Sequence, residues 1–328
     1  MWFESLIGFH EESPTQVHRN ISVEGNVLKS HVNGKKYICG YLEISSLAEL
    51  RDRVNKLSDS GKISVREIIA DVQQLHMEKS NAGALFQVAS QFNLLEMTSP
   101  DVTPEDGVDR YEYDHTQGPA CAIAAGAGTI YRNYFVEING SLGQTRENQI
   151  DCLADLGRAL GNLSGRLWKM KNGYALATSD GLIEINNKIE SATESEIDEL
   201  RELLRIGIQW DTEVTLGNVK HTVTQVYCSA LPVAYSRLPS DLWAGFAKLV
   251  LEATYEATIC AGILNYRRSG NNKVYLTLVG GGAFGNDMGW IINAINRSLK
   301  LYKNCALDVS VVSYRYSNPH VQNLIRLF

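Results

Sequence analysis

The stretch "GGGAFGN", residues 280–286, places glycines and an aromatic residue between a strand-like segment, "VYLTLV", and a helix-like segment, "GWIINAINRSL". Glycines at such a turn let the backbone approach a ligand closely and direct successive N–H groups into one concavity. The following helix N-terminus adds positive potential, so a phosphate group is the expected ligand. Phe284 would then cover an aromatic or sugar face. The alternative interpretation is a tight turn that needs positive φ angles only for packing.

A second turn, Gln117 to Pro119, enters a run of small residues and directly follows the titratable residues Glu112, Asp114 and His115. Backbone amides at this turn could meet phosphate or ribose. A carboxylate beside them could polarise a water molecule or stabilise a developing oxocarbenium ion. The alternative is a solvated charged loop, which we favour for His115 alone.

A third feature is the acid in "IIADVQQLH", where Asp71 and Val72 end a strand-like segment. An acid at a strand end usually caps the next turn. Next to two phosphate-binding turns, Asp71 could instead accept a hydrogen bond from an exocyclic amine such as that of adenine.

The elements that must position these residues alternate between strand and helix patterns, which predicts a three-layer α/β fold with much of its sheet parallel. Residues 193–207, "TESEIDELRELLRIG", predict a strong helix. Residues 165–178 predict a hairpin with Asn-Gly at its turn. Ser46 is expected to cap one helix and Gly161 to end another.

The domain organisation expected from these patterns is one enlarged domain rather than two. Residues 1–62 form an N-terminal accessory extension, and residues 63–328 form the main domain. A large insertion interrupts the main domain at about residues 137–218.

The order of the motifs resembles the macrodomain family of ADP-ribose binders. A strand leads into "ADV", another into "VASQFN", a turn leads into small helical residues, and strand "TLV" leads into "GGGAFGN". The resemblance implies a three-layer α/β/α fold with a mixed, mostly parallel sheet. It also implies adenine contacts from Asp71 and Val72, proximal-ribose contacts from Asn93 or its neighbours Ser90 and Gln91, and two loops around the diphosphate. The first loop comprises Gln117, Gly118, Pro119, Ala120 and Cys121, and the second comprises Gly280, Gly281, Gly282, Ala283, Phe284, Gly285 and Asn286.

The departures from the family pattern refine the expected activity. The segment "QGPACAIA" lacks the paired glutamates of poly(ADP-ribose) glycohydrolases. The insertion and the acid-rich run are more similar to an atypical, glycohydrolase-type branch that includes ADP-ribosyl-arginine hydrolases. We therefore expect a hydrolase that removes mono-ADP-ribose from protein side chains, arginine first, by cleaving the C1″–N bond. Asp114 is the principal catalytic candidate, Glu112 the second, and Gln117 an orienting hydrogen-bond partner.

Two rival functions stay open at this stage. A non-catalytic ADP-ribose reader would keep both glycine loops and Asp71 but would not use Asp114. An unrelated nucleotide-binding or structural protein would use the glycine turns only for packing. The expected partners are ADP-ribose, as ligand and product, and a mono-ADP-ribosylated protein, and no cofactor is expected.

Composition excludes several other classes. The formal net charge of −6 gives no support for a nucleic-acid surface. The glycine motif is neither the spaced dinucleotide fingerprint nor a P-loop, because no Gly-Lys-Ser/Thr follows it. The histidines lack ligand spacing, so no metal site is expected. No apolar stretch is long enough to cross a bilayer. The six cysteines form no C-x-x-C pair, and their apolar surroundings suit a reducing cytoplasm.

Overall fold

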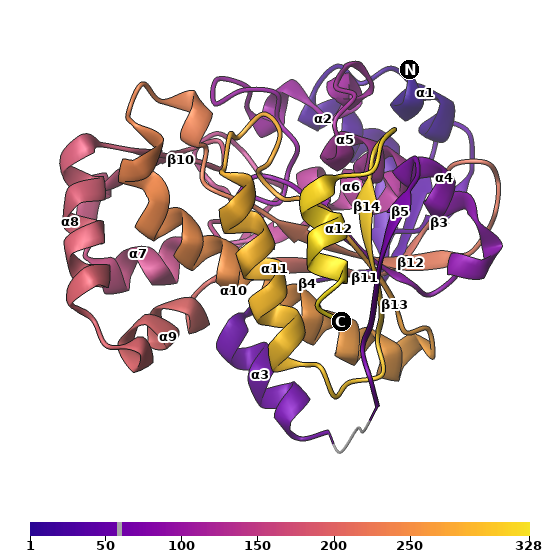
Figure 1. Cartoon of the computed structure of the whole chain (residues 1–328). Helices are drawn as coiled ribbons and strands as arrows, with labels where there is room; N and C mark the ends of the chain where they lie inside the picture. Colours follow the sequence, from indigo (N-terminus) through magenta and orange to yellow (C-terminus); the bar gives the residue numbers. More distant parts are fainter. Residues whose placement is uncertain (58–60) are drawn as a thin grey trace.

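The fold is built on a seven-stranded sheet, seen in the computed structural model, which describes residues 1–57 and 61–328. The strand order is β4-β11-β12-β6-β13-β14-β5 (Figure 1). Strand β11 is antiparallel to both of its neighbours, and the other neighbouring pairs are parallel. In the order of the sheet, the strands are β4 (Tyr41–Ser46), β11 (Arg205–Glu213), β12 (Thr222–Cys228), β6 (Leu85–Ala89), β13 (Lys273–Leu276), β14 (Asp308–Ser313) and β5 (Ser64–Ile69).

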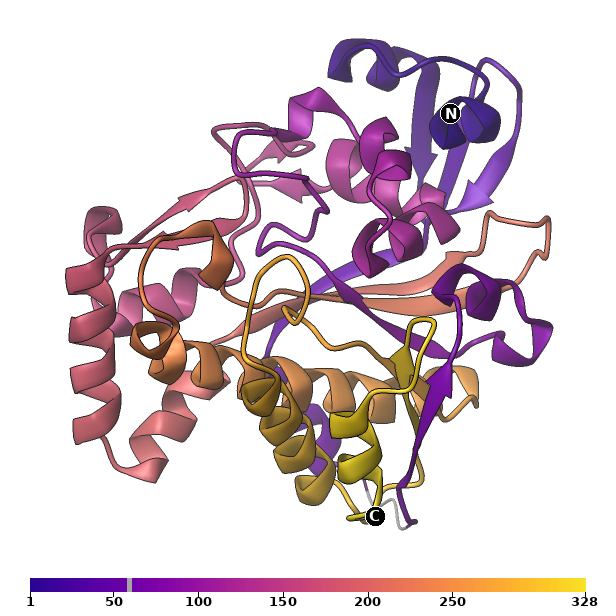
Figure 2. The same cartoon turned by 45° about the horizontal axis from the view of Figure 1, so that its top comes forward.

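Helices cover both faces of this sheet, which confirms the predicted three-layer α/β fold with a mixed, mostly parallel sheet. Figure 2 shows the two helical layers on opposite sides of the strands. One layer contains α3 (Leu47–Asn55), α10 (Ser240–Ser269), α11 (Met288–Leu301) and α12 (Pro319–Ile325). The other contains α4 (Val72–Met77), α5 (Gln117–Ala124) and α6 (Gly126–Ile130).

Helix α10 is the centre of its layer because it packs on the sheet and also contacts α3, α8, α9 and α11. Its side chains from Trp243 to Asn265 are largely buried, as expected of a helix that is apolar on all sides. The helix ends follow local sequence. Ser46 and Glu49 form the reciprocal hydrogen bonds of a capping box at α3, as predicted for Ser46. Gly161 ends α7 (Ala154–Leu160) in the left-handed conformation, also as predicted.

The segment expected to be an N-terminal extension contributes to two structures. Helices α1 (Trp2–Ile7) and α2 (Pro14–Asn20) and a separate sheet of β1 (Ile21–Glu24), β2 (Val27–Ser30) and β3 (Lys36–Ile38) share a second hydrophobic core with α5 and α6. Strand β4 and helix α3 belong to the central sheet and its covering layer. Residues 58–60 of the expected extension lie outside the described residues.

The segment expected to be an insertion also supplies a central strand. It contains β7 (Glu137–Ile138), β8 (Ser141–Leu142), α7, β9 (Trp168–Lys171), β10 (Tyr174–Ala177), α8 (Ser179–Ser191) and α9 (Glu194–Glu202). Strands β9 and β10 form the predicted hairpin with Asn172-Gly173 at its turn. The predicted helix over 193–207 is wrong at its end: α9 stops at Glu202 and β11 begins at Arg205, where β-branched and aromatic residues are buried between two strands.

Within the described ranges, no helix is both long enough and apolar enough to span a membrane. The six cysteines, all in the described part of the chain, are free thiols.

Candidate functional site

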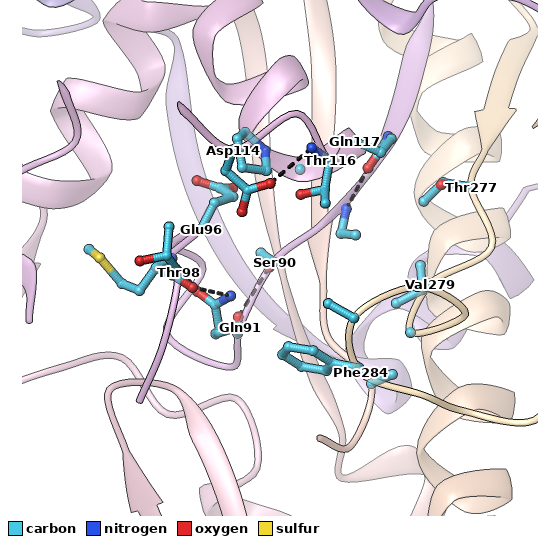
Figure 3. Close-up of a pocket in the computed structure, with 18 of the residues that line it drawn as sticks. Ser90, Gln91, Glu96, Thr98, Asp114, Thr116, Gln117, Thr277, Val279 and Phe284 are labelled. Carbon is cyan, nitrogen blue, oxygen red and sulfur yellow. Dashed lines mark hydrogen bonds between the residues drawn. The ribbon is translucent and has the colours of Figure 1, made fainter. Parts of the chain in front are cut away.

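A cavity of about 250 Å³ lies where parallel strands end at their carboxyl edge, the usual position of ligand sites in α/β sheets. Its walls come from the segments after β6, β12 and β13, from the N-terminus of α5 and from the insertion (Figure 3). The lining residues used below are Ala89, Ser90, Gln91, Glu96, Met97, Asp114, Thr116, Gln117, Gly118, Pro119, Tyr174, Ala230, Tyr235, Thr277, Gly280, Gly282, Ala283 and Phe284.

The first turn, at the start of α5, is fixed against strand β6 by Gln117 and Gly118. The Gln117 side chain accepts a hydrogen bond from the Ala89 amide (2.9 Å) and donates one to the Gln87 carbonyl (2.8 Å). Pairing between β6 and β13 has ended at Phe86, so this side-chain amide replaces the backbone of a neighbouring strand. A Cβ on Gly118 would lie 2.0 Å from the Ala89 carbonyl oxygen, and only glycine permits this approach.

The N-cap residue of α5 does not satisfy the first backbone N–H groups of the helix. Thr116 is the N-cap residue, and its side chain makes no capping hydrogen bond. Among the described residues, no acceptor is bonded to the amides of Gln117 or Gly118. The unpaired N–H groups of a helix N-terminus attract anions.

The second turn, after β13, contains glycines with different roles. Gly280 has φ +79° and its Cβ would lie 2.5 Å from that of Ala230, so the fold itself requires glycine there. At Gly282 the φ angle is not in the left-handed region, and a Cβ would meet nothing within 4 Å. Gly282 lines the cavity, so its missing side chain leaves space for a ligand.

Backbone amides are also free in this second turn. Within the described residues, the N–H groups of Gly282, Ala283 and Phe284 have no hydrogen-bond partner. The structure therefore places two turns with unpaired amides, residues 117–119 and 280–284, on the walls of one cavity. This pairing of turns suits an anionic group held between them.

Three aromatic rings close one side of the cavity. The ring centroids of Tyr174 and Phe284 are 5.3 Å apart, those of Tyr235 and Phe284 are 5.5 Å apart, and those of Tyr174 and Tyr235 are 5.0 Å apart. The Ala234 amide donates to the Phe284 carbonyl (3.0 Å), which ties the second turn to the segment after β12. Phe284 is therefore held in place at the cavity wall, where an aromatic ring can pack against an apolar or sugar face.

The most unusual lining residue is Glu96, which the sequence analysis did not identify. Its side chain is almost fully buried, with 2 % exposed, and neither carboxyl oxygen has a hydrogen-bond partner among the described residues. The nearest cation is Arg132, whose Nη2 lies 3.7 Å from Oε1. Burial raises the pKa of Glu96 to about 8, against the opposing effect of Arg132.

The loop that carries Glu96 is closed by Gln91. The Gln91 side chain accepts from the Met97 amide (2.6 Å) and donates to the Met97 carbonyl (3.1 Å). Tyr174 donates its hydroxyl to the same carbonyl (2.6 Å). The hairpin turn of the insertion adds a further hydrogen bond, from the Phe92 amide to the Gly173 carbonyl (3.0 Å). The insertion thus holds Glu96 against the cavity.

Asp114 is the second carboxylate of the cavity, and it is half-buried rather than enclosed. Its Oδ1 accepts from the Thr116 amide (2.9 Å), which fixes the bend before α5. In Figure 3, Asp114 and Glu96 lie on the same side of the cavity. Two carboxyl groups with different burial are the arrangement that divides acid and base roles.

Several residues expected at the site do not line the cavity. Glu112 accepts a hydrogen bond from the Trp2 amide (2.9 Å) and secures the N-terminal helix. Asn93 is buried, where it donates to Gln149 (2.9 Å) and accepts from the Leu95 amide (3.2 Å). The Oδ1 atom of Asp71 caps α4 through the amides of Gln73 and Gln74. Six further residues are also absent from the lining: Val72, Ala120, Cys121, Gly281, Gly285 and Asn286.

Across the parts of the chain that the structure describes, no three or more His, Cys, Asp and Glu side chains are grouped so that they could hold a metal ion. The cavity itself offers amide donors, aromatic rings and two carboxyl groups.

Comparisons with known proteins gave structural similarities alone. No protein-family model and no curated protein matches the chain. Poly(ADP-ribose) glycohydrolase from Deinococcus radiodurans in complex with ADP-ribose is similar with a TM-score of 0.46 and 10% identity, over 87% of this chain and 92% of that chain. Poly(ADP-ribose) glycohydrolase from Thermomonospora curvata is similar with a TM-score of 0.46 and 12% identity, over 96% of both chains. At this level of similarity, the chemistry must follow from this chain's own residues.

Proposed function

We propose that this chain is a macrodomain-type ADP-ribosyl glycohydrolase, which binds ADP-ribose and cleaves the bond at C1″ of its proximal ribose. The observation that carries the proposal is Glu96, a buried carboxyl that has no hydrogen-bond partner among the described residues and lies beside two turns with free amides. Buried polar groups are normally satisfied, so a site that leaves both oxygens unpaired is suited to a ligand that pairs with them.

The order of strands along the carboxyl edge suggests how the ligand lies. The Glu96 loop follows β6, the second turn follows β13, and Asp71 follows β5, with β14 between the last two. The diphosphate would lie between the two turns, with the proximal ribose toward Glu96 and Asp114. The adenine would extend toward Asp71, where only Oδ2 remains free of the α4 cap. The exposed ring of Tyr314, just after β14, lies at the same edge.

The two carboxyl groups then have complementary roles. Glu96, with its pKa raised to about 8, is mostly protonated near neutral pH and can donate a proton to the leaving atom. Asp114 would stabilise positive charge on the ribose as the C1″ bond breaks, and would orient the attacking water. The water supplies hydroxide to C1″, and its proton restores the acid. Gln117 acts on the chemistry only by fixing α5, because its amide is bonded to β6.

The type of glycosidic bond that we propose follows from whether its leaving atom must be protonated. The oxygen of an O-glycosidic bond must be protonated before it can leave, and a protonated Glu96 supplies that proton. An ADP-ribosyl guanidinium already carries its proton, so the arginine linkage expected from the sequence makes less use of a neutral acid. We therefore propose an O-glycosidic substrate, with the arginine N-glycoside as the alternative that the assay must compare.

A non-catalytic reader is the alternative of a different class. A reader needs the amides and Phe284, but gains nothing from burying a carboxyl group whose oxygens are unpaired, which is unfavourable for stability.

The test is incubation with peptides that carry mono-ADP-ribose on serine, arginine or glutamate, and with poly(ADP-ribose), followed by detection of released ADP-ribose. We expect release from an O-linked substrate, and strong loss of release in both Glu96→Gln and Asp114→Asn. Binding of ADP-ribose without release from any substrate would support the reader. Equal activity of Glu96→Gln and the parent would remove Glu96 from the mechanism.

A further inference from the structure

Among the described residues, Arg132 is the only basic residue that pairs with Glu96, and both side chains are almost fully buried. We propose that Arg132 is a positioning residue for this site: its charge sets the proton affinity of Glu96, and its hydrogen bond to Leu94 holds the Glu96 loop. As a statement about catalysis, this inference rests on the proposed function, because it assigns Arg132 a role through the acid. As a statement about Glu96, it can be tested without any substrate.

Several contacts fix the position of the Arg132 side chain. It follows α6 in a buried π-helical turn, Tyr131–Phe135, and its side chain is 0 % exposed. Its Nε donates to the Leu94 carbonyl (3.0 Å), and its guanidinium carbon lies 3.5 Å from the ring centroid of Tyr227. Nη2 donates weakly to Thr129 Oγ1 (3.4 Å). The guanidinium therefore cannot move far toward or away from Glu96.

The Leu94 bond links Arg132 to the acid through the backbone. Leu94 lies two residues before Glu96 and has φ +64°, an unfavourable angle for a branched side chain. Such a conformation persists only where surrounding contacts hold it. The Arg132 Nε bond to this carbonyl is one such contact.

The guanidinium of Arg132 and the carboxyl group of Glu96 are close but not hydrogen-bonded. The Nη2 to Oε1 separation of 3.7 Å exceeds hydrogen-bond distance, and Nη1 has no partner among the described residues. A purely structural buried pair would be expected to close such a gap, because unpaired buried charge is costly. The open geometry leaves the Glu96 oxygens available to a substrate, while Arg132 still acts on them through space.

Other groups near Glu96 act in different directions. Arg132 favours the ionised carboxyl, whereas the Asp114 carboxylate disfavours it. The Glu96 amide donates to the Tyr111 hydroxyl (3.0 Å). The titratable groups that interact with Glu96 are Arg132, Asp114, Tyr111, Tyr227 and Cys121, and burial raises the pKa of the two tyrosines and the cysteine so that they stay neutral. Arg132 is thus the cation of this group.

The experiment is a carboxyl ¹³C NMR titration of Glu96 in full-length protein, with Glu96→Gln to assign the signal. Removing the cation in Arg132→Met should raise the pKa of Glu96 by at least about one unit. Arg132→Gln is a second neutral variant in case the methionine variant does not fold. Arg132→Lys keeps a positive charge and should stay closer to the parent than either neutral variant. Tyr227→Phe keeps the stacked ring and should leave the titration unchanged.

An unchanged Glu96 pKa in a folded neutral variant would overturn the proposal, as would an equal shift in Arg132→Lys and Arg132→Met. These outcomes do not depend on activity, so they are distinguishable from failure of the proposed function. Where cleavage is measurable, the alkaline limb of the pH–rate profile should move to higher pH in the neutral variants, because protonated Glu96 is the active form. A uniform loss of rate without this movement would indicate a merely structural Arg132 and would contradict the proposal.

Discussion

Two glutamates of this chain are equally buried and differ in how they are paired. Glu96 and Glu256 are each 2 % exposed. Glu256, in α10, accepts from Nε and Nη2 of Arg51 (2.6 and 2.9 Å), from Arg297, and from the Tyr302 hydroxyl (3.3 Å). Neither oxygen of Glu96 accepts any hydrogen bond within the described residues.

The difference is the one expected between a structural carboxylate, Glu256, and the catalytic carboxyl group that we propose, Glu96. Glu256 joins α3, α9, α10 and α11, because Arg51 and Arg297 also bond Asp198 of α9. Its burial is offset by charge-assisted hydrogen bonds, which makes the network part of the packing. Glu96 has lost water without gaining such bonds, so its free energy can improve only when something enters the cavity. Burial alone would not have distinguished them.

The largest expected effect is a loss of cleavage rate when Glu96 is substituted. Glu96→Gln should lower the rate of glycosidic cleavage by about 10²–10⁴-fold, the usual contribution of a general acid. Its free energy of unfolding near neutral pH should be no lower than that of the parent, because no hydrogen bond to the carboxyl is lost and glutamine has no proton for the unfolded chain to release. Steady-state kinetics and urea unfolding measure the two quantities. A stable enzyme with parental rates would place the acid elsewhere.

The matched substitution at the other glutamate should have the opposite result. Glu256→Gln should lower the free energy of unfolding by about 3 kcal/mol, because Arg51 and Arg297 lose a buried counter-charge. Cleavage by the folded fraction should be retained, since Glu256 does not line the cavity. Chemical denaturation and assays at low temperature measure this. Loss of activity in fully folded protein would link the network to the site.

A smaller effect concerns the pH dependence of stability. Glu96 has a folded pKa of about 8 against an ordinary value of 4.5, so the folded state holds its proton more tightly. Its contribution is therefore fully present below pH 4.5 and declines as pH rises to about 8. Burial also raises the pKa of Glu11 to about 7, with the same sign, in parent and variant alike. Unfolding at several pH values should show a flatter dependence for Glu96→Gln; parallel curves would contradict the burial of an ionisable group here.

The smallest expected effect contrasts a structural glycine, Gly280, with a cavity-lining glycine, Gly282, in the turn after β13. Gly280→Ala should cost about 1 kcal/mol or more of stability, because alanine is strained at φ +79°. Gly282→Ala should leave stability nearly unchanged and instead weaken binding of ADP-ribose. Thermal unfolding and binding measurements on the two variants separate the roles. Equal loss of stability would mean that both glycines serve only packing.

The fold was largely predictable because its signals are local. Alternating strands and helices, the Ser46 cap, the Asn172-Gly173 turn and the end of α7 at Gly161 each depend on a few neighbouring residues. Strand β11 was missed because it directly follows a strongly helical segment, and its conformation depends on pairing with β4 and β12.

The two turns could be read from their glycines, but the acid could not. Glu96 stands in "FNLLEM", and its signal is a single charged residue in an apolar run. That signal does not say which space the side chain faces. The direction depends on Gln91 closing the loop and on the insertion docking through Gly173, which are contacts between distant segments. Glu112 illustrates the opposite error. Its place near Asp114 in the sequence suggested a catalytic role, but in the structure its carboxylate accepts a hydrogen bond from the distant Trp2 amide.

The central claim is that the two turns and Glu96 form one ADP-ribose site. Calorimetric titration of free ADP-ribose into the full chain tests it most directly, with Gly282→Val to fill the cavity and Glu256→Gln as the control distant from it. We expect saturable binding to one site in the parent and in Glu256→Gln, and loss of that binding in Gly282→Val. Absence of saturable heat at millimolar ADP-ribose, or full binding by Gly282→Val, would contradict it.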